Sequence, residues 1–281
     1  MRVVDSPFAD PESQLSATGR GPTWSQTERE LLDTLAVVHA EAAMVGWEFS
    51  RLDERWSVDE PWWDFENDCL EAMRSTRQSI LDLGTGGGER LSLLVRSLHE
   101  PPALLPQIFA TEGWAPNIAV ARSSLAPWSI PVMEYDSDAG DVLPLAERSL
   151  GVVMARHESY EASEVARVLA PGGRFLTQQV DGYDAPEIHN WFGDDFRYPD
   201  VTADAHAASL RDAGMRIDQV DEWSGQMRFA DATALVTYLA LVPWDAPDFS
   251  VEAHAQRLLD LEASAPIVVT QRRFRIYGTL E

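Results

Sequence analysis

The stretch ILDLGTGGGE, residues 80–89, constrains the fold more than any other part of this sequence. An apolar run ends at Leu83, and glycines then occupy the alternate positions 84, 86 and 88. Glycine lets the backbone of a turn come close to a ligand. A strand, such a turn and a helix form the first unit of a doubly wound α/β sheet, whose ligands bind at the carboxyl ends of the strands. We therefore expect a ligand site around this turn.

Apolar runs alternate with helical stretches from residue 79 onward. Strands are expected at 79–84, 107–113, 131–136, 150–158 and 172–180, and helices at 89–100, 115–126 and 161–170. Two long strands, 215–229 and 266–280, enclose helices at 231–242 and 251–264. This alternation predicts βαβ crossovers. The expected fold class is α/β, with a doubly wound, seven-stranded, mostly parallel sheet.

The N-terminal third differs from the rest of the chain. Residues 1–24 are rich in Pro, Ser, Gly and Asp without periodicity, which predicts a flexible arm. Ser25 and Glu28 fit a capping box that starts a helix, and a second helix is expected from about Pro61 to Arg74. We expect a helical cap or lid over 25–75 and the main domain over 76–281. Most of the six aromatic residues within 47–65 are expected to pack the cap, with one or two facing the pocket.

Charge and composition narrow the function. The chain has 46 acidic and 22 basic residues, a formal net charge of −24, and no basic run longer than QRRFR at 271–275. Binding to phosphate backbones rests on clustered cations, so a nucleic-acid partner is disfavoured. One cysteine, no apolar segment long enough for a membrane and no secretory signal favour a cytoplasmic protein, monomeric or homodimeric. No histidine pair has metal-ligand spacing, so no metal is expected.

The spacing around the glycines separates two ligand classes. A dinucleotide fingerprint, G-x-G-x-x-G, needs a glycine at position 89, where this chain has Glu89. Asp82 instead stands two residues before the first glycine. An acid there repels a pyrophosphate but pairs with the ammonium of a ligand that carries an amino acid. The pattern favours an adenosyl amino acid, with NAD as the alternative.

Two further acids extend the pattern: Glu112 ends the second strand in FATEG, and Asp136 follows the third in EYDSD. With these residues the chain resembles the class I S-adenosylmethionine-dependent methyltransferases over roughly 75–281. VARVLAPGGRFL (165–176) resembles the helix and turn before the family's fifth strand. The resemblance implies an antiparallel last strand, a ribose contact for Glu112 and an adenine contact for Asp136. The implied cofactor site comprises Asp82, Gly84, Thr85, Gly86, Gly88, Glu112, Gly113, Asp136, Ser137 and Arg156.

His157, in ARHES after the fourth strand, lies where the resemblance implies a substrate pocket beside the cofactor methyl. Histidine accepts protons near neutral pH, so His157 is the candidate general base. Alternatively, His157 or Arg156 only contacts the cofactor or caps the next helix. Glu158 either orients the imidazole or begins that helix with a favourable charge.

Substrate contacts are expected from Trp63, Gln178 and His189. Strand alternation puts Gln178 and Gln179 on opposite faces of the sheet, so at most one of them contacts a substrate. For EIHNWFG, which holds His189 and Trp191, a surface loop is the favoured interpretation. The expected function is methyl transfer from S-adenosylmethionine to a small organic molecule of bacterial secondary metabolism. The alternatives are an RNA- or protein-modifying methyltransferase and a non-catalytic module that binds S-adenosylmethionine or a nucleotide.

Overall fold

The computed structural model describes residues 23–42, 49–99, 104–193 and 195–281. The expected flexible arm, 1–24, lies outside these residues apart from its last two positions, and so does Trp47 of the aromatic cluster. Among the described residues, no helix is long and apolar enough to span a membrane. The boundaries expected between arm, cap and main domain stay a prediction.

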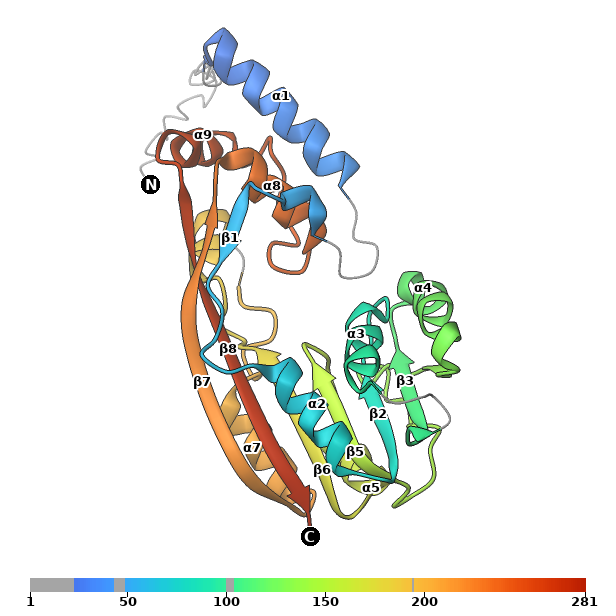
Figure 1. Cartoon of the computed structure of the whole chain (residues 1–281). Coiled ribbons are helices and arrows are strands. Elements are labelled where there is room, and N and C mark those ends of the chain that lie inside the picture. The colour runs from blue at the N-terminus through green and yellow to red at the C-terminus, as the bar shows by residue number, and fades with distance from the viewer. Residues whose placement is uncertain (1–22, 43–48, 100–103, 194) are drawn as a thin grey trace, which may run out of the picture.

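A single sheet of eight strands organises the described chain (Figure 1). The strands are β1 (Trp56–Val58), β2 (Ser79–Leu83), β3 (Ile108–Glu112), β4 (Val132–Glu134), β5 (Leu150–Arg156), β6 (Leu169–Val180), β7 (Met215–Phe229) and β8 (Ile267–Leu280). Their spatial order is β1-β7-β8-β6-β5-β2-β3-β4. Strands β2 to β6 are parallel, whereas β8 lies antiparallel between β6 and β7. The expected mostly parallel sheet with an antiparallel last strand is confirmed, and β1, antiparallel on β7, is an additional eighth strand.

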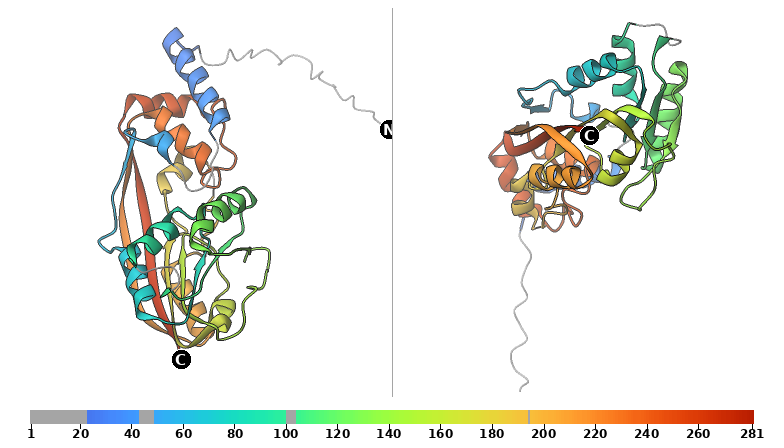
Figure 2. Two further views of the ribbon diagram at one scale, coloured as in Figure 1. Left: turned by 45° about the vertical axis from the view of Figure 1, so that its right-hand side comes forward. Right: turned by 90° about the horizontal axis from the view of Figure 1, so that it is seen from below.

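Helices cover both faces of this sheet, as crossovers between parallel strands require. They are α1 (Gln26–Glu41), α2 (Phe65–Ser75), α3 (Glu89–Ser97), α4 (Ala115–Leu125), α5 (Ala162–Val168), α6 (Pro186–Phe192), α7 (Ala203–Asp212), α8 (Ala232–Leu241) and α9 (Ala255–Ala263), with short 3₁₀ turns η1 (Ser50–Leu52) and η3 (Ala126–Trp128). One core lies between the sheet and α2, α3 and α4, and a second lies between the opposite face and α5 and α7. Figure 2 shows the two helix layers on either side of the strands.

A third core lies beyond the parallel strands. Strands β7 and β8 are 15 and 14 residues long, and Figure 1 shows them extending past the end of the other strands. Their far ends pack with α1, α6, α8, α9, η1 and β1 around buried side chains of α8. We call this assembly the helical lobe. The two N-terminal helices therefore separate: α1 packs on α8 in the lobe, and α2 lies on the face of the sheet.

Local sequence signals explain how several elements begin. Helix α1 starts with the expected capping box, in which the Glu28 N–H donates to Ser25 Oγ at 3.2 Å and the Ser25 N–H donates to Glu28 Oε2 at 2.6 Å. Helix α2 is capped by Asp64, whose Oδ1 accepts from the Asn67 N–H at 2.9 Å. The cap fixes the start of α2 at Phe65, four residues later than the expected Pro61. Residues 61–64 thus form a connection in front of α2.

Candidate functional site

The glycine turn joins β2 to α3 at the carboxyl edge of the sheet. The Gly84 N–H donates to Thr111 Oγ1 at 3.2 Å, and the Thr85 N–H donates to the Thr111 carbonyl at 2.8 Å, so the turn is fixed to β3. Gly84 has a φ of +71°, and a Cβ there would collide with the side chain of Glu158. Glycine is therefore required both for the backbone conformation and for the close approach of Glu158.

Three carboxyl groups meet around this turn: Asp82 at the end of β2, Glu112 at the end of β3 and Glu158 after β5. Burial raises the pKa of Asp82 to about 6. Glu112 is 4% exposed, and burial raises its pKa although its Oε1 accepts from the Trp114 N–H at 2.8 Å. Burial first, and then the charges of neighbouring acids, raise the pKa of Glu158 to about 8. Asp82 and Glu158 are half-buried beside the buried Glu112, so these acids repel one another when they are ionised.

The loop after β4 adds two of the expected cofactor residues to the same edge. Asp136 is exposed, and its Oδ1 accepts from the N–H groups of Asp138 and Ala139 at 2.9 and 3.3 Å. The Ser137 hydroxyl is buried and has no hydrogen-bond partner within the described residues. Gly113 packs so closely that a Cβ would lie 2.7 Å from the Tyr135 carbonyl oxygen. The structure therefore places these residues next to the end of the strand that carries Glu112.

His157 follows β5 directly, with a left-handed φ of +55°. Its main-chain N–H donates to the Gln178 carbonyl at 2.8 Å, and its Nε2 lies 3.2 Å from the Gln178 side-chain nitrogen. The Gln178 side chain is held in turn by Trp63, whose indole N–H donates to Gln178 Oε1 at 2.6 Å. Burial, followed by the positive charges of Arg273 and Arg90, lowers the pKa of His157 to about 3. His157 is a neutral imidazole at physiological pH.

Glu158 does neither of the two things expected of it. Helix α5 begins at Ala162 with Glu161 as its cap, so Glu158 does not start that helix. The imidazole is held by Gln178 instead, and the Glu158 side chain lies over Gly84. The Gln179 amide nitrogen instead donates to Thr177 Oγ1 and to the Glu158 carbonyl, at 2.7 and 2.9 Å. Of the two glutamines, Gln178 is the one that joins the His157 side chain.

Arg156, expected to contact the cofactor, pairs with Glu66 of α2, which also pairs with Arg90 of α3. The Arg156 Nε is buried and has no hydrogen-bond partner among the described residues. Arg156 therefore connects the end of β5 to the helix that covers the site. Its contact with a cofactor stays a prediction.

The chain resembles known proteins at the level of the fold. Neither the known protein families nor the curated proteins contain a match to this chain. Among solved structures, the YcgJ protein of Bacillus subtilis aligns with a TM-score of 0.54 at 14% identity, covering 77% of this chain and 98% of that one. A proposed methyltransferase of Bacillus halodurans C-125 aligns with a TM-score of 0.51 at 16% identity, covering 76% and 97%. The chain has the class I methyltransferase fold.

In this methyltransferase fold, the acids and glycines lie at the carboxyl edge of the parallel strands, where doubly wound sheets bind ligands. Asp82, Glu112 and the loop at Asp136 come from the three neighbouring strands β2, β3 and β4. Sequence spacing therefore identified side chains that the fold does bring together. Their roles toward a ligand stay predictions.

His189 lies on a helix, and its contact with a substrate stays a prediction. The surface-loop interpretation of EIHNWFG is wrong, because these residues form helix α6, with Ile188 and Phe192 buried in the helical lobe. The His189 ring packs on Phe196, with the ring centroids 4.3 Å apart. Within the described part of the chain, no hydrogen bond or ring contact connects His189 to His157 or Gln178. The loop interpretation failed because a seven-residue helix shows too little periodicity.

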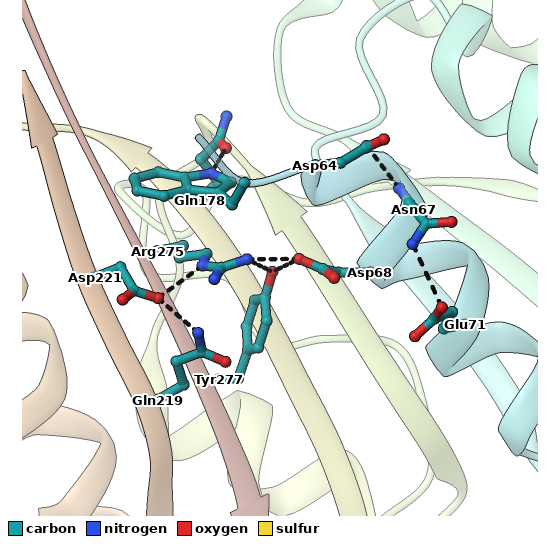
Figure 3. A network of polar contacts seen from close by, with 10 residues as sticks. Asp64, Asn67, Asp68, Glu71, Gln178, Gln219, Asp221, Arg275 and Tyr277 are labelled. Atoms are coloured by element: carbon teal, nitrogen blue, oxygen red, sulfur yellow. Dashed lines mark hydrogen bonds and ion pairs between the residues drawn. The ribbon is translucent and has the colours of Figure 1, made fainter. Parts of the chain in front are cut away.

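Sequence reasoning missed a buried polar cluster that anchors α2. Arg275 of β8 is 5% exposed and pairs with Asp68 of α2 at 2.6 Å and Asp221 of β7 at 2.9 Å. Figure 3 shows the guanidinium group between these two carboxylates, beside Tyr277. The Tyr277 hydroxyl donates to Asp68 at 2.5 Å. The run QRRFR contained a signal for this cluster, because alternation along β8 puts Arg273 and Arg275 on one face of the sheet.

Among the residues described, no group of His, Cys, Asp and Glu side chains is arranged to hold a metal ion. The single cysteine, Cys69, is buried in α2, and burial raises the pKa of its thiol well above the ordinary value. Such a thiol is a poor nucleophile, since the thiolate is the reactive form. The described residues at this edge offer carboxyl groups, an imidazole, amides, aromatic rings, the Ser137 hydroxyl and the Arg156 guanidinium.

Proposed function

We propose that this protein transfers a methyl group from S-adenosylmethionine to a small organic molecule. The observation that carries the proposal is the convergence of Asp82, Glu112 and Glu158 at the glycine turn. Apart from burial, every influence that raises the pKa of Glu158 is another acid. Carboxylates gathered away from water repel each other, and a cationic ligand removes that repulsion. S-adenosylmethionine carries both an ammonium and a sulfonium group, and so matches the charge of the site.

The residues at this edge also fit the remaining parts of the cofactor. Glu112 is 4% exposed and would accept from the ribose hydroxyls, while Asp82 would pair with the ammonium. The unpartnered Ser137 hydroxyl and the second oxygen of Asp136 would face the adenine. The glycine turn offers backbone to the amino-acid portion without intervening side chains. When bound, S-adenosylmethionine supplies a methyl group that is already activated for displacement.

The protein's part in such a transfer is to bind the acceptor, align it with the methyl group and exclude water. Direct displacement needs no nucleophile from the protein, which agrees with the buried and protonated thiol of Cys69. Trp63 and Gln178, from the connection before α2 and from β6, lie beside His157 and would form the wall against which an acceptor is positioned. His157 stays neutral beside these groups and so does not repel a sulfonium.

A small-molecule acceptor agrees with the charge distribution. The formal net charge is −24, and two arginines of the longest basic run are already paired. Arg273 binds Asp184 at 2.8 Å, and Arg275 binds two carboxylates. Arginines engaged in this way do not offer a surface for phosphate backbones. These observations support a small acceptor over RNA.

Calorimetric titration with S-adenosylmethionine and S-adenosylhomocysteine tests the cofactor directly. Glu112→Ala should weaken binding about 30- to 1,000-fold, the loss expected for two hydrogen bonds to a buried charged group. Glu134→Ala is the matched control, because Glu134 lies beside Glu112 at the end of the neighbouring strand, 65% exposed and paired with Arg122. Binding of neither compound, or equal losses in the two variants, would exclude the proposed site. Binding of NAD instead would favour the dinucleotide alternative.

The pH dependence of binding has a defined sign. Glu158, with a pKa of about 8, is almost fully protonated at pH 6 and half ionised at pH 8. The affinity for S-adenosylmethionine should rise over this range by up to about ten-fold per pH unit. The affinity for S-adenosylhomocysteine should rise less, because its sulfur is uncharged. Labelled methyl groups that enter RNA or protein in preference to small amines, alcohols and carbon acids would move the substrate class to one of the alternatives.

A further inference from the structure

The tautomer of His157 is fixed by a chain of side-chain hydrogen bonds. Trp63, Gln178 and His157 come from the connection before α2, from β6 and from the end of β5, respectively. The indole nitrogen lies 2.6 Å from Gln178 Oε1, and the Gln178 amide nitrogen lies 3.2 Å from His157 Nε2. Trp63 and Gln178 are 7% and 4% exposed. The first link is therefore sheltered from competing water, and the second, to the half-buried His157, is partly sheltered.

The direction of each hydrogen bond follows from the chemistry of the first one. An indole N–H can only donate, so the Gln178 atom that it contacts must be the amide oxygen. The Gln178 NH₂ group then faces His157, and it too can only donate. His157 Nε2 must accept this bond through its lone pair. The proton of the neutral imidazole is consequently on Nδ1.

We propose that Trp63 and Gln178 are positioning residues that hold His157 as the neutral Nδ1–H tautomer, so that His157 meets a ligand as a hydrogen-bond donor. To serve as a general base through Nε2, the ring would first have to break its bond with Gln178. Within the described residues, no hydrogen bond engages Nδ1, so this N–H is available to a ligand. The catalytic meaning of the assignment rests on the proposed methyl transfer.

The charged groups around the ring favour its neutral form, which the tautomer assignment requires. Arg273 of β8 and Arg90 of α3 are the charged groups that act most strongly on His157, and both disfavour an imidazolium. A neutral donor suits an acceptor molecule that presents an oxygen or nitrogen lone pair to Nδ1. His157 would then bind and orient the acceptor molecule, in place of the general base expected from the sequence.

Two-bond ¹H–¹⁵N correlation spectra of the full-length protein, labelled at histidine, test the tautomer without any cofactor. His157→Asn assigns the signal by its disappearance. The wild-type spectrum should show Nδ1 protonated and Nε2 unprotonated. Trp63→Phe frees the Gln178 amide to rotate and should shift the tautomer ratio about five-fold toward Nε2–H, the effect of one net hydrogen bond. Gln178→Glu should place the proton on Nε2, because a carboxylate can only accept.

Trp62→Phe is the matched control. Trp62 precedes Trp63 in the chain and contacts its ring edge, but it is 66% exposed and donates no hydrogen bond to Gln178. This variant should leave the wild-type spectrum unchanged. A wild-type Nε2–H tautomer, or a spectrum that Trp63→Phe does not alter in folded protein, would overturn the proposal. If the tautomer is as expected but S-adenosylmethionine does not bind, the proposed function fails and the tautomer assignment stands.

Discussion

Glu158→Gln is the substitution whose effect can be derived most directly from the structure. Burial and the neighbouring acids raise the pKa of Glu158 from 4.5 to about 8. Between these two values the folded protein keeps a proton that the unfolded chain has released. The free energy of unfolding of the wild type must therefore fall as the pH rises through this window. A glutamine has nearly the same shape but no such proton, so the variant should lack this part of the decline.

The magnitude follows from the width of the shift. At about 1.4 kcal/mol per pKa unit, the full effect is roughly 5 kcal/mol, of which about 2 to 3 kcal/mol falls between pH 5 and pH 7. Urea unfolding of both proteins, followed by tryptophan fluorescence, measures it. The stability of the variant relative to the wild type should increase by about 2 to 3 kcal/mol over that range. Parallel stability curves would refute the argument that Glu158 is buried among acids.

The remaining predictions concern packing and catalysis. Arg275→Met should lower the free energy of unfolding by about 3 kcal/mol, because it leaves Asp68 and a second carboxylate without an ion-pair partner. Arg216→Met, at an ion pair whose arginine is 58% exposed, should lower it by less than about 0.5 kcal/mol. Gly88→Ala should destabilise by about 1–2 kcal/mol in thermal unfolding, because its φ of +84° disfavours a side chain. His157→Ala should lower kcat about ten-fold, the loss of one neutral hydrogen bond. A loss of about 10²–10⁴-fold would restore the general-base interpretation.

Most of the sheet could be predicted because its strands are bounded by local signals. The runs at 79–84 and 107–113 correspond to β2 and β3 within one or two residues, and the long terminal pair corresponds to β7 and β8. Strand β1 could not be found, since three residues contain no readable alternation and their strand conformation depends on pairing with β7. Helix α6 escaped for a related reason: its burial depends on the helical lobe, which forms from segments far apart in the chain.

The sequence predicted the site residues that lie at the ends of neighbouring strands. It did not predict contacts between side chains that are far apart in the chain. Asp82 and Glu112 end adjacent parallel strands, so the fold alone brings them together. Trp63 and Gln178 are separated by 115 residues, and nothing in the sequence pairs one particular tryptophan with one particular glutamine. The raised pKa of Glu158 depends on its placement over Gly84, which is likewise a three-dimensional contact.

Helix α2 and the connection before it link these observations. Polar contacts fix this segment to the sheet, among them Trp63 to Gln178, Glu66 to Arg156, and Asp68 to both Arg275 and Tyr277. Apolar packing alone tolerates small shifts of a helix along a sheet, whereas buried hydrogen bonds and ion pairs are satisfied in one position only. The contacts of Trp63 and Glu66 involve residues next to His157 in space or in sequence. These contacts therefore fix the position of α2 on the sheet, and the Trp63 contact also fixes the orientation of the imidazole through Gln178. A change that loosens α2 should alter the His157 tautomer before it unfolds the protein.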